Sequence, residues 1–237
     1  MKINGAVAVV AITAGIVTSL AAVGGAAQAP TTPEEMVATL KQNLAESQKR
    51  LRRYEWLETT SISLKGEEKS RQQQRAHYGA DGTLTKIPVG APPKAKSGRG
   101  IRGRVAENKK DDMKDYMERA SNLIHLYVPP SPAQIQTAKD TGNMLLRPLP
   151  QGQMGVEFPN FIQPSDRLTL GVDTKALLLV ALNVATYLDK PEDAVTLDVR
   201  FGTLNDGTSY TARTTLDAKA KNIRVVVENS GHRLLPQ

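Results

Sequence analysis

The spacing of hydrophobic residues changes several times along the chain, and each change marks a different kind of element. In residues 32–53 the apolar side chains recur every three or four positions, which predicts an amphipathic helix with one narrow apolar stripe. In residues 54–64 the period becomes two, as in a strand with one apolar face. A turn at Lys65 and Gly66 follows, and residues 67–78 return as a strongly polar strand.

The register of this first hairpin is not fixed by the pattern. Depending on the centre of the turn, Glu58 lies opposite Gln73 or opposite Arg75. A second turn at residues 80–82 leads to a short third strand at 83–89.

The middle of the chain predicts two helices. An exposed loop at residues 91–104, rich in proline, glycine and basic residues, precedes the first helix, which covers residues 105–127 with a broad apolar stripe. Pro129 and Pro130 end this helix, because proline lacks a donor and restricts the residue before it. A second, short helix covers residues 132–139.

The C-terminal part alternates with period two and predicts strands. Residues 145–149, 156–162 and 167–172 are three short candidates. Four longer strands follow, and their alternating positions are Leu178, Val180, Leu182 and Val184; Val195, Leu197, Val199 and Phe201; Tyr210, Ala212, Thr214 and Leu216; and Ile223, Val225 and Val227. This pattern is typical of an antiparallel sheet with one apolar face.

The order of these elements is helix, strands, two helices and a long meander, which predicts the α+β class. A sheet of about eight to eleven strands twists strongly and must curl. The polar strand at residues 67–78 cannot lie between two apolar layers, but it can lie at a margin of the sheet that is exposed to water. We therefore expect a strongly curved antiparallel sheet, an unclosed half-barrel, with helices packed on its concave face.

Residues 1–29 have the layout of a secretory signal peptide, with a positive start, a largely apolar centre and small residues at the end. Cleavage after Ala29 places Pro30 behind the cut, so cleavage after Ala27 is the alternative. The apolar run of about 18 to 20 residues could also span a bilayer, so a retained anchor is the competing interpretation. We expect residues 30–237 to form a single domain, monomeric and either periplasmic or secreted.

The net charge of +7 adds a second feature, because the basic excess is concentrated in one stretch. Its members are Lys94, Lys96, Arg99, Arg102 and Arg104, with Lys109 and Lys110 close behind. Such a patch favours anionic surfaces, so these residues are candidates for contact with lipid headgroups. A solvated basic loop is the alternative, and export argues against nucleic acid as a partner.

No motif points to catalysis. The chain has no cysteine, which excludes disulfides, thiolate metal sites and cysteine nucleophiles. His77, His125 and His232 lie far apart and lack the spacing of metal ligands. Neither a phosphate-binding glycine loop nor G-x-S-x-G occurs. We expect a protein that is not an enzyme, with no catalytic residues, cofactor or metal.

Several stretches together resemble one known family. They are the helix that leads into "YEWLETTSISLKGE", the central "AENKKDDMKDYMERASNLIHLYV", and the strands "RLTLGVDTKALLLVALNVATYL", "AVTLDVRFGTLNDGTSYTARTTL" and "KNIRVVVENSGHRLL". With the signal peptide, this order is similar to exported proteins of the LolA/LppX-like superfamily, which includes carriers of lipoproteins or lipids and an anti-sigma-factor regulator. The resemblance implies an unclosed β-barrel with a helical lid and an apolar cavity for acyl chains. The basic stretch and the few aromatic residues depart from the family, which leaves the cargo open.

Two functions are compatible with these expectations. The first is a carrier that binds a lipid or a lipoprotein acyl chain on an apolar face formed by Trp56, Ile62, Leu64, Val195, Leu197, Val199, Phe201 and Tyr210. In the competing interpretation the helices fill this face and the same side chains are ordinary core. The second function is an envelope-sensing or scaffold module that binds a protein partner. Transient contact with a membrane or an envelope protein is expected for both.

Overall fold

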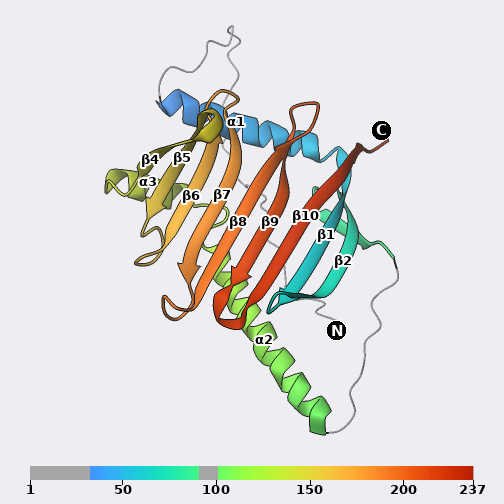
Figure 1. Cartoon of the computed structure of the whole chain (residues 1–237). Helices are drawn as coiled ribbons and strands as arrows, with labels where there is room; N and C mark the ends of the chain where they lie inside the picture. Colours follow the sequence, from blue (N-terminus) through green and yellow to red (C-terminus); the bar gives the residue numbers. More distant parts are fainter. Residues whose placement is uncertain (1–32, 91–100, 237) are drawn as a thin grey trace.

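The computed structural model describes residues 33–90 and 101–236, which form three α-helices and one ten-stranded sheet (Figure 1). The helices are α1 (Pro33–Leu51), α2 (Ile101–His125) and α3 (Pro132–Asp140). The strands are β1 (Tyr54–Leu64), β2 (Glu67–Tyr78), β3 (Leu84–Pro88), β4 (Leu145–Leu149), β5 (Gln153–Pro159), β6 (Arg167–Asp173), β7 (Leu178–Tyr187), β8 (Ala194–Thr203), β9 (Ser209–Ala218) and β10 (Ile223–Leu234). The predicted α+β class is confirmed.

Every pair of neighbouring strands in the sheet is antiparallel. The strand order is β3-β2-β1-β10-β9-β8-β7-β6-β5-β4, so the first strand pairs with the last. The edges formed by β3 and β4 do not pair with each other, and the sheet remains unclosed as predicted. The sheet thus consists of two meanders, β1 to β3 and β4 to β10, which meet where β1 pairs with β10.

The register of the first hairpin differs from both predicted alternatives. Glu58 lies opposite Gln74, because a register shift between Ile62 and Ser63 displaces the ladder by one residue. Near the turn Leu64 is opposite Glu67, and that register alone would have placed Glu58 opposite Gln73. The extra residue at this bulge accounts for the difference of one position.

Helix α2 begins at Ile101, so residues 101–104 of the predicted loop at 91–104 are helical. No proline follows Pro93 in that stretch, and Gly103 within a helix costs only about 1 kcal/mol. Residues 91–100 lie outside the described part of the chain. The N-terminal half of α2 projects past the ends of the strands, while its C-terminal half crosses behind the sheet (Figure 1).

Helix α1 lies across the other end of the strands. Asn43 Nδ2 donates to the carbonyl oxygen of Leu177 at 3.0 Å, and Arg50 Nε donates to Thr208 Oγ1 at 3.2 Å. The buried Ser47 Oγ accepts the backbone N–H of Ser209 at 3.2 Å. These bonds attach α1 to the β6–β7 and β8–β9 turns, and its apolar stripe is only half-buried, as the narrow stripe predicted.

Candidate functional site

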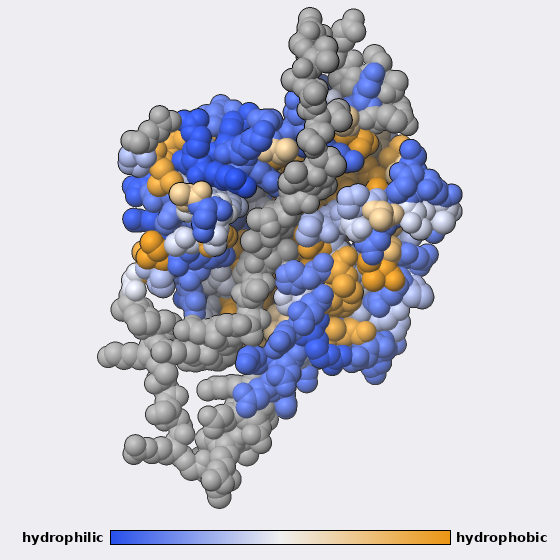
Figure 2. Space-filling model, turned by 180° about the vertical axis from the view of Figure 1, so that it is seen from behind, coloured by the Kyte–Doolittle hydropathy of each residue, from blue (hydrophilic) through white to orange (hydrophobic). Residues whose placement is uncertain are grey.

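The apolar face of the sheet is the candidate site. Period-two alternation directs one row of side chains from each of β5 to β10 onto this face, and each row contains buried apolar side chains. They are Phe158, Leu168, Leu182, Val184, Val195, Leu197, Val199, Leu216, Ala218, Ile223, Val225 and Val227. Seen from behind, hydrophobic residues gather on the side where α2 crosses (Figure 2).

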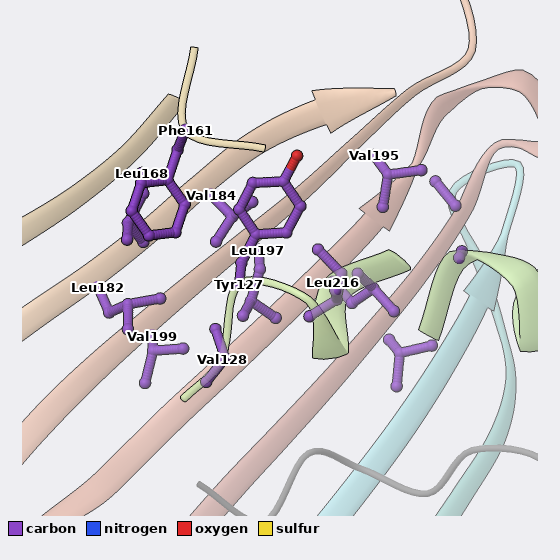
Figure 3. Close-up of a cluster of buried hydrophobic side chains, with 14 of the residues drawn as sticks. Tyr127, Val128, Phe161, Leu168, Leu182, Val184, Val195, Leu197, Val199 and Leu216 are labelled. Atoms are coloured by element: carbon purple, nitrogen blue, oxygen red, sulfur yellow. The ribbon is translucent and has the colours of Figure 1, made fainter. Parts of the chain in front are cut away.

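A roof covers the centre of this face. The C-terminal half of α2 contributes Tyr116, Met117, Ala120 and Ile124, and the chain then places Tyr127 and Val128 over the strands. Figure 3 shows Tyr127 and Val128 lying among Val184, Leu197 and Leu216. Because Val195, Leu197 and Val199 are no more than 2% exposed, sheet and roof are in direct contact here.

A further set of apolar side chains is only partly buried and packs against the cluster. We call this set the rim; it consists of Ile62, Leu64, Met113, Leu123, Ile135, Met144, Val156, Ile162, Leu170, Leu188 and Phe201. The partly exposed surface of these side chains can be covered by a further apolar group. Each Å² of apolar surface removed from water in this way contributes about 25 cal/mol to binding.

The structure divides the eight residues predicted for the apolar cavity. Val195, Leu197 and Val199 belong to the buried cluster, and Ile62, Leu64 and Phe201 belong to the rim. Trp56 and Tyr210 lie outside both sets. Whether any of the eight contacts a ligand stays a prediction.

Trp56 and Tyr210 instead meet in an aromatic group around His232. The ring centroids of Trp56 and His232 are 5.8 Å apart and nearly parallel, and those of Tyr210 and His232 are 4.1 Å apart. Tyr78 lies 5.7 Å from Trp56 on the other side. Burial lowers the pKa of His232 to about 4, so the ring is neutral at neutral pH. The buried Trp56 Nε1 has no hydrogen-bond partner among the described residues.

Two register shifts explain this second group. One lies between Glu55 and Leu57 in the pairing of β1 with β10, and the other lies between Arg200 and Phe201 in the pairing of β8 with β9. The second shift breaks the alternation from Leu216 back to Tyr210, so Tyr210 pairs with Gly202. Gly202 leaves room for the ring, since a Cβ there would lie 2.9 Å from it.

Polar contacts fasten the middle of α2 to the loop between β7 and β8. Tyr116 Oη donates to Asp193 Oδ1 at 2.5 Å, and Arg119 Nη2 donates to Asp189 Oδ1 at 2.5 Å. Lys221 Nζ also lies 5.8 Å from the centre of the Tyr116 ring. Burial raises the pKa of Tyr116, and its bond to Asp193 raises it further, so the hydroxyl keeps its proton and acts as a donor.

A buried carboxylate that the sequence analysis missed fixes the other end of the roof. Asp166, 3% exposed, accepts Tyr127 Oη–H at 2.5 Å and three backbone N–H groups from residues 161–163 at 2.5, 2.9 and 2.7 Å. Thr186 Oγ1 lies 2.8 Å from the same Tyr127 hydroxyl. Burial raises the pKa of Tyr127, and so does its bond to Asp166. In the sequence, only the turn-forming residues that precede β6 could have indicated this hydrogen-bonded carboxylate.

Most of the predicted headgroup-binding residues lie outside the described part of the chain, namely Lys94, Lys96 and Arg99. Arg102 and Arg104 are in the first residues of α2, in its projecting half (Figure 1). Their contact with an anionic surface stays a prediction.

Among the side chains that the structure describes, in residues 35–90 and 111–236, no three His, Asp or Glu gather as metal ligands would. No helix in this part is long and apolar enough to cross a bilayer. The predicted signal peptide at residues 1–29 lies outside it.

Comparison with known proteins gives similarities of fold. No protein-family model matches the sequence, and no curated protein matches it. A DUF1329 family protein from Desulfovibrio piger is similar in structure, with a TM-score of 0.36 and 11% identity over 84% of this chain and 90% of that one. A LolA superfamily protein from Nitrosomonas europaea has a TM-score of 0.37 and 10% identity over 84% of this chain and 94% of that one. The second bears the superfamily name that the sequence patterns resemble, and since both TM-scores lie below 0.5, neither similarity bears on the ligand of this chain.

Proposed function

We propose that this chain is an exported, non-catalytic protein that binds an acyl chain of a lipid or lipoprotein between the sheet and α2. The observation that carries the proposal is the rim, a set of partly buried apolar residues packed against the roofed apolar face. A methylene group transferred from water to such a surface contributes about 0.8 kcal/mol, so one acyl chain supplies most of the affinity.

Binding under the roof requires α2 to give way, because the centre of the face is closely packed. The packed half of α2 meets the sheet through apolar side chains, which an acyl chain can replace without loss of hydrogen bonds. Its polar attachments are the bonds of Tyr116 to Asp193 and of Arg119 to Asp189. These attachments would therefore control how fast a ligand is taken up.

The test is the uptake of a fluorescent fatty acid by the full-length chain. Tyr116→Phe removes the bond to Asp193 but keeps the ring in the core, so uptake should become several-fold faster. Tyr187→Phe is the matched control, because its hydroxyl donates to the Pro164 carbonyl at 3.0 Å, a bond that does not involve α2. Equal rates in both variants would contradict access under α2. A lipid-free mass for protein purified from its host's envelope, together with no probe binding, would overturn the proposal itself.

The second candidate function, binding of a protein partner, is favoured by a different observation. The edge strand β4 exposes Leu145, Leu146 and Leu149, which are 41%, 61% and 39% exposed. An exposed apolar strand edge is suited to pairing with another chain. If the protein is recovered without lipid, Leu146→Glu should abolish a stoichiometric complex with an envelope protein, while Ile87→Glu on the opposite edge should leave it intact.

Export itself is tested at the N-terminus. Sequencing of the mature protein from the host should find it beginning at Gln28 or at Pro30, after cleavage at Ala27 or Ala29. An intact N-terminus in the membrane fraction would instead establish the retained anchor.

A further inference from the structure

A groove lies at the strand ends next to the β1–β2 turn, and its lining combines polar residues from the face opposite the apolar cluster with Ala218 and Ile223 of the cluster itself. Its volume is about 480 Å³. Its floor is one row of directly opposed residues across four strands: Ser63, Arg224, Asp217 and Thr196. Arg224 stands between Ile223 and Val225, both buried in the cluster, so alternation turns it to the other face.

The charges around this groove do not cancel. Arg224 donates to Asp217 through Nε at 2.7 Å and Nη2 at 3.1 Å, so these two groups neutralise each other. Lys65 and Lys219 line the groove as well, and neither has an ion-pair partner among the described residues. Two positive charges without an ion-pair partner among the described residues therefore remain in the lining of the groove.

Neutral donors accompany the lysines. The hydroxyl groups of Ser63 and Thr196 and the side-chain amide of Asn222 line the same groove, and none has a hydrogen-bond partner among the described side chains and backbone. Two ammonium groups, two hydroxyls and an amide offer more donors than a carboxylate can accept. They match a phosphate group, whose several oxygens each accept strong hydrogen bonds.

The local backbone holds this arrangement in place. Lys65 and Asn222 both have positive φ, at 53° and 50°, and the N–H of Lys65 donates to the carbonyl oxygen of Asn222 at 2.8 Å. This bond ties the β1–β2 turn to the segment between β9 and β10 that carries Lys219. The two walls of the groove are therefore fixed before any ligand arrives, which lowers the entropic cost of binding.

We propose that this groove binds a phosphate-bearing group through Lys65 and Lys219, with Ser63, Thr196 and Asn222 as neutral donors. The proposed contacts use none of the side chains of the apolar cluster, so the site does not depend on the acyl-binding function proposed above. The phosphate can belong to a lipid headgroup or to a small molecule in solution, and the two sources are separated by experiment.

The experiment compares two double variants of the full-length chain that lose the same charge. Lys65→Gln with Lys219→Gln alters the groove, and Lys41→Gln with Lys175→Gln removes two exposed lysines at the α1 end. Binding is measured by calorimetry with inorganic phosphate and by sedimentation with phosphatidylglycerol vesicles, with phosphatidylcholine vesicles as reference. The groove variant should weaken binding at least about tenfold, because two charge-assisted contacts are lost, whereas the control should change it less than about twofold.

Each outcome either supports the phosphate site or overturns it. Binding of inorganic phosphate that is lost in the groove variant supports the site with a small-molecule source. Binding of phosphatidylglycerol vesicles alone, lost in the same variant, supports it with a headgroup source. Absence of both kinds of binding in the wild-type chain, or equal losses in the two variants, overturns it. Uptake of the fatty-acid probe should be the same in the groove variant and the wild type, so failure here leaves the acyl-binding proposal standing.

Discussion

Replacement of the buried carboxylate Asp166 is the most direct test of how the roof is attached to the sheet. In Asp166→Asn one acceptor oxygen becomes an NH₂ group that faces a backbone N–H, so at least one buried donor loses its partner. An unsatisfied buried donor costs about 1–3 kcal/mol, and the loss of the charge weakens the remaining bonds by a similar amount. The free energy of unfolding should therefore fall by about 2–6 kcal/mol, a large share of the total for an ordinary domain.

Urea titration measures this loss, with the fluorescence of Trp56, the only tryptophan in the chain, as reporter. Asp81→Asn is the control, because it removes the same charge from an exposed turn where the carboxylate accepts from Thr83 at 2.8 and 2.9 Å. The control should lower the free energy of unfolding far less than Asp166→Asn does. Equal stabilities for the two variants would refute the role assigned to Asp166.

Further predictions concern the core and the aromatic group. Leu197→Ala should lower the free energy of unfolding in urea by about 3 kcal/mol, because its 2% exposed side chain leaves a cavity; an unchanged midpoint would place Leu197 outside the core. Gly202→Ala should cost about 1–2 kcal/mol through contact with the Tyr210 ring, and Tyr210→Ala in the same chain should relieve it. Stability should fall between pH 6.5 and about 4, since below pH 6.5 only the unfolded chain protonates His232. That loss, about 1–2 kcal/mol after allowance for partial solvation, should be absent from the pH profile of His232→Gln.

The sequence was most informative where structure is local. Strict alternation located the strands from Leu178 to Leu234, because each side of a strand meets either core or water along its whole length. The same alternation identified Val195, Leu197 and Val199 as neighbours on one face. The class and the unclosed sheet followed from the order of the elements.

Alternation could not predict where the pairing of two strands becomes irregular. A bulge leaves the composition of a strand unchanged, so nothing in residues 54–78 indicated that Glu58 would face Gln74. The same kind of shift removed Tyr210 from the face to which alternation had assigned it. The bonds of Asp166 depend on the packing of Tyr127 from a distant segment, which no local pattern reports.

The polar strand β2 explains where the apolar face ends. On β1, Ile62 lies opposite Val225 of β10 but opposite Ser70 of β2, so it is buried on one side only and belongs to the rim. Farther along the same strand, Glu58 is buried and pairs with Lys86 of β3 at 2.8 Å, a pair whose disruption would cost about 3–5 kcal/mol. A charged pair held this firmly cannot yield to an acyl chain. Under the proposed function, the ligand therefore cannot extend past β1 toward β3, and Ile62 is the rim residue expected to contact it on this side.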